Sequence, residues 1–390
     1  MFIFLRNFMK GGVADAATTG RDIAFPRSKP DLRMDMRGPV FVDVFSGAGG
    51  SALGFVWAGF RPLAALDRYR WAVKTYAENI GIEPVKADAF FFDWRRWVRE
   101  LGDVDVLVGC PPCQGFSRLR LNLARRYEDG EDDPRNMLVL VYLRAVEALK
   151  PRAVVFENVP WVERSDYFRR LVEGLRRLGY YVRWAVLDAA DYGVPQRRKR
   201  LILVGLMGRE PWGFPPTPTH GRPDSREVRE GLRRPWRTVR QAIRDLPPLG
   251  PGERHPSIPN HETKPLPPHW LELIKHIPKD GGSRHDVPPE LLLPAHRRLG
   301  RRGFNDVFGR LWWDRPSVTI TTGCWNPSKG RYIHPEQDRG LSLRECARLQ
   351  GFPDDFVFLG PPSSVARQIG EALPPPLAET VAKSLKEMLP

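Results

Sequence analysis

Short apolar runs alternate with stretches of helical spacing through the first half of the chain. Apolar runs of about four to eight residues, bounded by turn residues, predict buried strands. We expect strands at 40–45, 63–66, 104–108, 153–156, 180–187 and 201–204. Apolar positions at helical spacing predict helices between them, the strongest at 137–149 and 167–178. Strands that alternate with helices predict an α/β fold with a mainly parallel, doubly wound sheet covered on both faces.

This pattern stops near residue 208. Residues 209–340 are rich in Pro, Arg, His and Trp and hold few periodic segments, which predicts a second, smaller and loop-rich lobe. Regular spacing then resumes: Ser342 and Glu345 have the spacing of a capping box, and a last helix is expected at about 377–389. We therefore divide the chain into a weakly structured N-terminal extension at 1–38, a main domain at 39–208, the second lobe at 209–340, and a C-terminal segment at 341–390 that returns to the main domain.

The charge balance is unusual for a chain of otherwise ordinary composition. Lys and Arg number 61 against 46 Asp and Glu, which gives a net charge of +15. A surplus of this size favours a polyanionic partner, and nucleic acid is the commonest one. Four cysteines are too few for a disulfide framework, and we find neither a signal peptide nor an apolar run of the roughly 18 residues that a membrane helix needs. These features predict a soluble, cytoplasmic protein without a membrane partner.

A glycine-rich turn, Phe45-Ser46-Gly47-Ala48-Gly49-Gly50, follows the first expected strand and opens a helix. Glycines at such a turn let the backbone approach a nucleotide-like ligand and expose the amides of the helix N-terminus. Asp67 ends the next strand, where a carboxylate can bind a ribose diol, and Asp88 is expected as a further ligand-facing carboxylate at the end of the strand after that. The turn alone is shared by many nucleotide folds, and either Asp taken singly is also typical of a simple turn.

The most distinctive segment is Gly-Cys-Pro-Pro-Cys-Gln-Gly-Phe-Ser at 109–117. Its Cys110 and Cys113 have the spacing of a zinc half-site or a redox dithiol. A zinc site would need a second pair, and Cys324 and Cys346 are isolated in the sequence. A redox dithiol usually opens a helix, whereas the polar run after Cys113 predicts a loop. We therefore interpret Cys113 as a lone nucleophile and Cys110 as an apolar wall residue, and we expect no metal ion.

An acid and two cations are expected close to this segment. Glu157 follows the strand at 153–156, so it emerges at the carboxyl edge of the sheet. The run Gln196-Arg197-Arg198-Lys199-Arg200 precedes another strand, and alternation along an extended chain puts Arg198 and Arg200 on the same face. A nucleophilic cysteine, an acid and two cations at neighbouring strand ends indicate an active site. The alternative is a structural cluster of ion pairs.

Taken in order, these motifs resemble the DNA cytosine-5 methyltransferase family, in its bacterial and archaeal restriction-modification type. The matching motifs are the turn at 43–50, the segment at 109–117, Glu157-Asn158-Val159, Gln196 with Arg198 and Arg200, and the later stretches 344–354 and 368–370. The resemblance covers about residues 39–388. It implies a Rossmann-like methyltransferase fold that uses S-adenosyl-L-methionine, with a catalytic domain at 39–208 and a target-recognition domain at 209–340.

The resemblance also implies a covalent mechanism. The Cys113 thiolate would add to carbon 6 of a flipped cytosine so that carbon 5 accepts a methyl group, while Glu157 would bind or protonate the ring nitrogen. Arg200 would grip the ring carbonyl, and Arg198 would help to hold the site together. The residues implied in the S-adenosyl-L-methionine pocket are Phe45, Gly47, Gly49, Gly50, Asp67, Asp88 and Leu138.

Contacts to double-stranded DNA are expected from two segments. The loop after Cys113, with Gln114, Ser117 and Arg118, would clamp the phosphate backbone. Residues 296–334 combine arginines, tryptophans and a threonine-rich run, which is typical of a surface that reads bases. The residues expected to contact DNA there are Arg310, Thr319 and Thr321. The family also implies a monomer with a cognate restriction endonuclease as its functional partner.

Two departures from the family pattern and two rival functions remain open. Glu371 stands where members usually have Asn after Gln-Ile-Gly, and Asp67 stands where many have Glu. A cytosine-5 methyltransferase acting on tRNA would carry a Cys-Phe-Thr tripeptide in its second lobe, which this sequence lacks. A catalytically dead DNA-binding relative is the other rival. The joint presence of Cys113, Glu157 and Arg200 argues against it.

Overall fold

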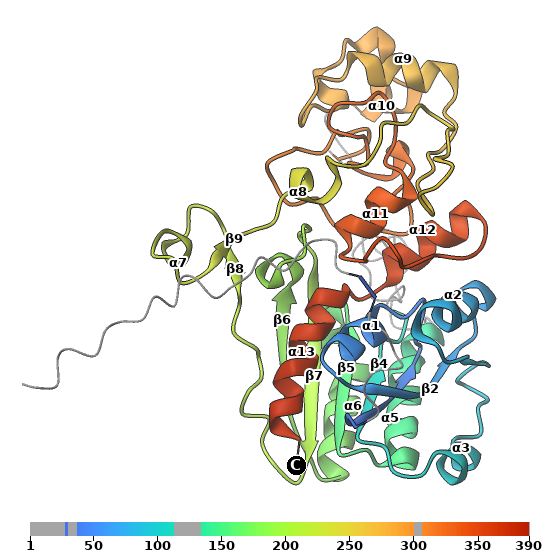
Figure 1. The fold of residues 1–390 in the computed structure, drawn as a ribbon, viewed down its shortest axis with the longest axis vertical. Coiled ribbons are helices and arrows are strands. Elements are labelled where there is room, and N and C mark those ends of the chain that lie inside the picture. Colours follow the sequence, from blue (N-terminus) through green and yellow to red (C-terminus); the bar gives the residue numbers. More distant parts are fainter. Residues whose placement is uncertain (1–27, 30–36, 113–133, 300–305, 390) are drawn as a thin grey trace, which may run out of the picture.

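The computed structural model describes residues 28–29, 37–112, 134–299 and 306–389 of the chain. Cys113, Gln114, Ser117 and Arg118 lie outside the described residues, as does most of the expected extension at 1–38. Figure 1 shows a lower part built around a β-sheet and an upper part made of short helices and loops. Within the described residues, no helix is both long enough and apolar enough to cross a membrane.

Seven strands form one sheet in the order β3-β2-β1-β4-β5-β7-β6. Their bounds are β1 Val40–Val44, β2 Arg61–Asp67, β3 Val85–Lys86, β4 Val106–Gly109, β5 Ala153–Asn158, β6 Tyr180–Asp188 and β7 Lys199–Met207. The pairs from β3 through β5 are parallel, whereas β7 runs antiparallel to both β5 and β6. The prediction of a mainly parallel α/β sheet is therefore confirmed, with β7 reversed.

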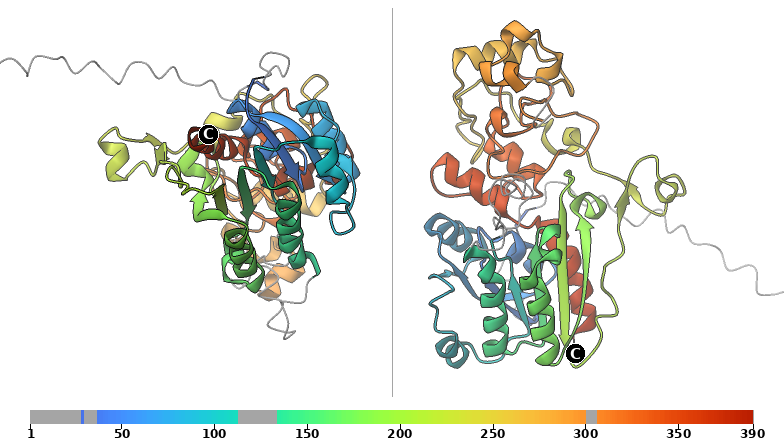
Figure 2. Two further views of the ribbon diagram at one scale, coloured as in Figure 1. Left: turned by 90° about the horizontal axis from the view of Figure 1, so that it is seen from below. Right: turned by 180° about the vertical axis from the view of Figure 1, so that it is seen from behind.

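Successive side chains of each strand enter two different hydrophobic clusters. In β1, Phe41 belongs to one cluster, while Val42 and Val44 belong to the other; in β5, Val155 and Phe156 are divided in the same way. Side chains of a strand alternate between the two faces of a sheet, so each face needs its own cover. Helices α1 (Gly50–Trp57), α2 (Arg70–Ile80) and α13 (Pro375–Met388) cover one face, and α3 (Trp94–Leu101), α5 (Leu138–Leu149) and α6 (Asp166–Arg177) cover the other. The view from below in Figure 2 shows the sheet between these layers.

The end of the chain returns to the sheet beside its beginning. Helix α13 packs directly on α1, and a Cβ atom at Gly54 of α1 would lie 2.5 Å from the Cβ of Ala378. Only glycine allows this approach, because the helices would otherwise have to separate. The apolar face of α13, which includes Leu377 and Leu385, completes the same core as β1 and β4.

The remaining helices and strands lie in the upper part of the molecule or in a short arm at its side (Figure 1). They are β8 (His220–Gly221), α7 (Arg226–Arg229), β9 (Arg234–Pro235), α8 (Val239–Ile243), α9 (Pro268–His276), α10 (Pro294–Leu299), α11 (Leu343–Leu349) and α12 (Pro362–Glu371). A third cluster of buried side chains lies in the upper part, built around Ile274, Phe308 and Ile333. Short 3₁₀ turns occur at Pro134–Met137, Pro160–Arg164, Ala189–Tyr192, Arg284–Asp286, Pro289–Leu291 and Pro327–Lys329.

The elements expected from the sequence agree with these bounds to within a few residues. The expected capping box is present, since the Ser342 hydroxyl accepts from the Glu345 amide and the Glu345 carboxylate accepts from the Ser342 amide. The sequence placed the end of a strand at Asp88, next to β3, without giving its bounds, and it did not predict α3. Strand β3 has two exposed residues, so it carries no apolar run that could fix its bounds.

Candidate active site

The residues expected to carry chemistry gather at one edge of the sheet. Phe45 follows β1, Asp67 ends β2, Cys110 follows β4 and Glu157 lies near the end of β5. These four strands are parallel, so their carboxyl ends meet at the same edge. In Figure 1 this edge faces the helices α11 and α12 of the upper part.

The glycine-rich turn leaves space above its backbone. Phe45 and Gly47 both have positive φ, of 58° and 53°, which folds the chain back sharply after β1. A Cβ built on Gly47 would meet nothing within 4 Å, so the surface of the turn is open there. Gly49 is the N-cap of α1, and Gly50 begins the helix. The Ser46 hydroxyl is buried and has no hydrogen-bond partner among the described residues.

Asp67 is joined directly to this turn. One carboxylate oxygen accepts from the Gly47 amide at 2.9 Å, and the other accepts from the Tyr69 amide at 2.7 Å. Burial raises the pKa of Asp67, while these two hydrogen bonds oppose the increase. The sequence therefore correctly placed the glycine-rich turn and this carboxylate together.

Asp88 follows β3, the outermost strand of the sheet, and Leu138 is the first residue of α5. The Asp88 carboxylate accepts from the Phe90 amide at 3.0 Å and lies 3.4 Å from Arg68 in an exposed ion pair. Leu138 is buried at the start of α5, in the cluster against which Phe45 packs.

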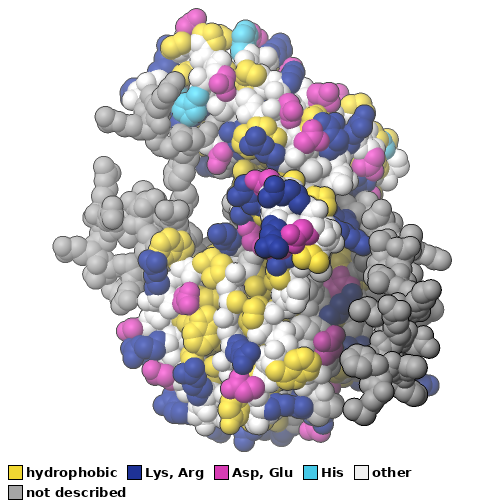
Figure 3. Space-filling view, turned by 90° about the vertical axis from the view of Figure 1, so that its left-hand side faces the viewer, with side chains coloured by type: hydrophobic (Ala, Val, Ile, Leu, Met, Phe, Trp, Pro, Cys, Tyr) yellow, Lys and Arg dark blue, Asp and Glu magenta, His cyan; other side chains and the backbone are white. Residues whose placement is uncertain are grey.

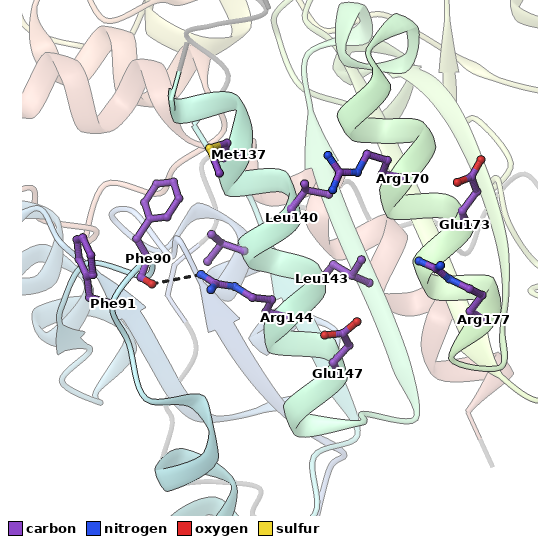
Figure 4. A pocket seen from close by; sticks show the side chains of 11 residues that line it. Phe90, Phe91, Met137, Leu140, Leu143, Arg144, Glu147, Arg170, Glu173 and Arg177 are labelled. Atoms are coloured by element: carbon purple, nitrogen blue, oxygen red, sulfur yellow. Dashed lines mark hydrogen bonds between the residues drawn. The ribbon is translucent and has the colours of Figure 1, made fainter. Parts of the chain in front are cut away.

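A hollow of about 590 Å³ lies beside these residues, on the outer side of α5 (Figure 4). Phe90, Phe91 and Met137 form its apolar end, and the Arg144 side chain donates to the Phe90 carbonyl at 3.2 Å. None of the residues assigned to chemistry by the sequence lines this hollow. It is adjacent to the candidate site and separate from it.

A buried acid and an arginine form the centre of the site. Arg200 Nε lies 2.9 Å from Glu157 Oε1, and the two side chains are only 13% and 9% exposed. Burial raises the pKa of Glu157, and the charges of Arg200 and Arg198 counteract that rise. An acid whose pKa is raised in this way holds and donates a proton more readily than an exposed carboxylate does.

Cys110 is a poor candidate for the nucleophile. Burial and the neighbouring carboxylates of Glu157 and Asp43 raise the pKa of its thiol well above the ordinary value. The neutral thiol is unreactive, and the residue packs against the core of the sheet. This agrees with its interpretation as a wall residue. Cys113 itself lies outside the described residues.

The chain leading into Cys113 is fixed next to Glu157. The side-chain amide of Asn158 donates to the Pro111 carbonyl at 3.1 Å in a buried position. The last described residues before Cys113 are therefore held beside the Glu157–Arg200 pair.

Arg198 and Gln196 connect the sheet edge to the rest of the molecule. Arg198 is buried and donates to the carbonyls of Ile320 at 2.8 Å, Gly370 at 2.8 Å and Ala372 at 3.1 Å. Gln196 accepts from the Ile320 amide at 2.8 Å, so the two side chains bind both polar groups of one residue. Arg198 thus acts as a positioning residue. Gln196 was part of the motif found in the sequence, but the sequence did not predict that it would bind Ile320.

Asp43 is a buried group that sequence reasoning missed. It is fully buried in β1, and burial, together with the nearby Asp67, raises its pKa to about 8, even though the Ser51 hydroxyl donates to it at 2.9 Å. Its second oxygen has no partner among the described residues. Its place inside an apolar run, Val-Asp-Val, was the available signal.

The structure contradicts the prediction that Arg310 contacts DNA. Arg310 is fully buried, and its guanidinium donates to the carbonyls of Ile274, Ile277, His334 and Gln337 and to the Asp338 carboxylate. All five N–H donors are used, so none remains for a phosphate or a base. Arg331, in the same expected segment, is also buried and bonds to Asp306 and to neighbouring carbonyls.

The threonines of the same segment are placed differently. Thr319 is half-buried and donates to the Arg197 carbonyl at 2.8 Å. Thr321 is exposed, with its hydroxyl 3.0 Å from that of Tyr332. Both therefore lie where the second lobe meets the sheet edge.

Three further features of the described residues concern the two remaining cysteines, metal binding and Glu371. Cys324 and Cys346, isolated in sequence, meet in the core, where the Cys346 thiol donates to the Cys324 carbonyl at 3.5 Å. No group of three or more His, Cys, Asp or Glu side chains in the described part of the chain could hold a metal ion. Glu371, which departs from the family pattern, pairs with Arg367 at 3.1 Å, and that guanidinium lies 4.5 Å above the Tyr69 ring.

Comparison with known proteins agrees with this arrangement. The family model of C-5 cytosine-specific DNA methylases matches residues 40–387. The chain is 36% identical over 354 residues to the type II methyltransferase M1.HphI of Haemophilus parahaemolyticus, covering 89% of this chain and 87% of that protein. It is 32% identical over 358 residues to the type II methylase M.HgiDII of Herpetosiphon aurantiacus, covering 89% and 95%. Among solved structures, S. pombe Dnmt2 methyltransferase shares the fold, with a TM-score of 0.58 and 16% identity over 90% of this chain and 98% of that one.

Proposed function

The chain belongs to the family of C-5 cytosine-specific DNA methylases, and from this premise we propose how its residues carry out the reaction. The activity is methylation of carbon 5 of cytosine in DNA, as in the type II enzymes of restriction-modification systems. The observation that carries the proposed mechanism is the buried Glu157–Arg200 pair beside the fixed segment that leads to Cys113.

In this mechanism Cys113 is the nucleophile. Carbon 5 of cytosine is unreactive, and addition of a thiolate to carbon 6 turns it into an enamine-like nucleophile. The new bond joins the sulfur to carbon 6, and the displaced electron pair moves toward carbon 5 and the ring nitrogen. After methyl transfer, loss of the proton on carbon 5 expels the thiolate and restores the ring. Positive charge near the thiol, for which Arg200 is the candidate, favours the reactive thiolate.

Glu157 receives the charge that develops on the ring nitrogen. Its raised pKa allows it to donate a hydrogen bond or a proton to that nitrogen as the thiolate adds. Arg200 holds the carboxyl group in place and directs its remaining donors toward the ring carbonyl. Arg198 acts indirectly, by fixing β7 against the carbonyls of Ile320 and Gly370.

The open glycine turn fits S-adenosyl-L-methionine. A polar cradle at a helix N-terminus is formed by the space above Gly47, the Ser46 hydroxyl, which has no partner among the described residues, and the neighbouring Asp67 carboxylate. The cofactor, when bound, supplies the methyl group. The residues that would hold it are Phe45, Gly47, Gly49, Gly50, Asp67, Asp88 and Leu138.

Recognition of the DNA sequence is assigned to the second lobe. The target cytosine must leave the duplex to reach the sheet edge, so DNA would lie between the two parts of the molecule. We assign Gln114, Ser117 and Arg118 to the phosphate backbone, and Thr319 and Thr321 to the DNA surface. We divide the chain as in the sequence analysis, with residues 209–340 as the target-recognition domain. We also propose a cytoplasmic monomer that works on double-stranded DNA with a cognate restriction endonuclease.

The experiment that tests the mechanism compares two single-cysteine variants. Purified protein is incubated with plasmid and tritiated S-adenosyl-L-methionine, and the methylated sites are mapped by bisulfite sequencing. We expect Cys113→Ala to abolish methyl transfer while cofactor binding persists, and Cys110→Ala to be tolerated. Duplex DNA with 5-fluorocytosine at the mapped site should trap a covalent adduct through Cys113. Equal loss of activity in both variants, or no adduct with active enzyme, would overturn the assignment.

The same assay separates the rival functions. Transfer of label to tRNA in place of plasmid would identify an RNA enzyme. DNA binding without transfer to either substrate would identify a catalytically dead relative.

A further inference from the structure

A short arm of the chain projects from the body of the protein. We define the basic arm as residues 220–237, which run from β8 through α7 to β9 and Arg237. Figures 1 and 2 show it standing apart from the sheet and from the upper lobe. No residue of α7 is buried, so the arm has no core of its own. Such a segment adds little to folding stability, and its exposed side chains are available for contact.

The base of the arm is nevertheless held firmly. The Trp236 indole donates to the Asp191 carboxylate at 2.8 Å, and the Arg197 guanidinium lies 4.3 Å above the Trp236 ring. β8 and β9 pair in parallel, with His220 opposite Arg234. The arm is therefore a positioned structure whose orientation relative to the sheet edge is fixed.

The arm carries an excess of positive charge. It contains six arginines and three acidic residues. Two of the acids neutralise neighbours, since Arg222 lies 2.7 Å from Asp224 and Arg226 lies 2.6 Å from Glu230. The positive charge of the arm also affects His220. Burial is the main cause that lowers the pKa of His220 to about 4, and the charges of Arg237 and Arg234 lower it further.

Three arginines of the arm are left for a partner: two beside its outer turn and one in β9, near its base. Arg229 and Arg234 are exposed, Arg233 is half-exposed, and none of the three forms an ion pair with the described residues. Arg229 and Arg233 lie on either side of a tight turn at Gly231, where Leu232 is 73% exposed, and Arg234 lies opposite His220. A single exposed leucine is too small for a stable protein interface, so the cations decide the class of partner.

The position of the arm connects it with the substrate. In the space-filling view, the arm faces the reader, and Lys and Arg side chains gather on it beside the hollow that separates the lower and upper parts (Figure 3). A duplex bound in that hollow would extend past the arm. Guanidinium groups bind phosphate oxygens strongly, and such contacts add affinity without reading the sequence.

We propose that the basic arm binds the sugar-phosphate backbone of duplex DNA that flanks the methylated sequence, outside the bases read by the rest of the target-recognition domain. This inference rests on the proposed function, because it requires DNA to occupy the hollow. The arm contributes affinity and salt dependence, and it takes no part in the chemistry at Glu157 and Arg200.

The test removes these three cations of the arm with the variant R229A/R233A/R234A. The matched control is R95A/R96A/R99A, which removes three exposed cations from α3 at the lower end of the molecule. Both variants are compared with the unaltered protein on two duplexes that carry the mapped methylation site at their centre. One duplex has about 14 base pairs and the other about 40, at about 3.4 Å per pair.

We expect R229A/R233A/R234A to bind the long duplex about tenfold more weakly, with a slope of log affinity against log salt that is shallower by up to about 2.7, or about 0.9 per lost phosphate contact. Its affinity for the short duplex and its rate of methylation there should match those of the unaltered protein. The control should behave as the unaltered protein does on both duplexes.

Equal weakening on both duplexes, no weakening on the long one, or the same loss in the control would overturn the proposal. In all of these outcomes the unaltered protein still methylates the short duplex. Absence of methylation in the unaltered protein would instead refute the proposed function, so the two failures are distinct.

Discussion

The Nε atom of Arg200 lies 2.9 Å from Oε1 of Glu157, and this contact joins β7 to β5 at the carboxyl edge of the sheet. The two residues are 43 positions apart in sequence and come from antiparallel neighbours. A charge pair this deeply buried depends on both partners, because removal of one leaves the other without compensation.

Arg200→Ala should therefore lower the activity and shift the pH at which Glu157 titrates. Loss of one partner of a buried pair destabilises by about 3–5 kcal/mol. The Arg200 charge lowers the pKa of Glu157, so its removal should raise that pKa further and extend the protonated form to higher pH. The limb of the kcat/KM profile that reports Glu157 should move to higher pH. Arg183→Ala, which breaks an exposed pair with Glu210, is the control and should change stability by at most about 1 kcal/mol. An unshifted profile in an active Arg200→Ala enzyme would separate Arg200 from the titration of Glu157.

Asp67→Ala should weaken cofactor binding and leave DNA binding unchanged. Loss of a charge-assisted hydrogen bond to a diol is worth about 1.5–3 kcal/mol, which is at least about a tenfold rise in the dissociation constant. The variant also loses the acceptor for the Gly47 amide, which acts in the same direction. Calorimetric titration with S-adenosyl-L-methionine measures the effect, with the exposed Glu100→Ala as control. Unchanged affinity in Asp67→Ala would remove this residue from the pocket.

Exchange of residues 296–334 for the equivalent segment of a family member with another specificity should change the methylated sequence. Arg310 and Arg331 are kept in the exchanged segment, because their hydrogen bonds hold the lobe together. Bisulfite mapping then reads out the new sites. An active hybrid that still methylates the original sequence would place recognition elsewhere, most simply in residues 209–295.

Asp43→Asn should stabilise the protein at neutral pH and not at pH 4. Burial raises the folded-state pKa of Asp43 from 3.8 to about 8, so the folded protein keeps a proton that the unfolded chain loses. Between those pH values the wild-type protein loses stability as pH rises, by up to about 1.4 kcal/mol per pH unit from this group. Asparagine keeps an acceptor for the Ser51 hydroxyl without this titration.

Urea unfolding of wild type and Asp43→Asn at pH 4 to 8 measures the difference between them. The exposed Asp314→Asn serves as control, since its carboxylate is paired only at the surface. A wild-type–variant difference that stays constant across the range would mean that Asp43 is ionised in the folded state.

Several features of this protein were determined by the sequence itself. The strands at β1, β4 and β5 follow from short apolar runs, because a strand buried on both faces needs apolar side chains on both. The capping box of Ser342 and Glu345 uses groups within one turn of helix, so its spacing is sufficient to predict it. Glu157 was placed at the sheet edge by its position after an apolar run. In each case the cause lies within a few residues along the chain.

Other features were decided only by tertiary structure. Arg310 resembles a DNA-binding arginine in sequence, yet the carbonyl groups that surround it come from residues up to 36 positions away. Cys324 and Cys346 meet because α11 packs on the turn that contains Cys324. Arg198 finds the Gly370 carbonyl 172 residues further on. The sequence specifies which groups can be buried or bonded, but a buried polar group takes its partner from whichever segment the folded chain brings beside it. That choice depends on long-range packing, which no local pattern records.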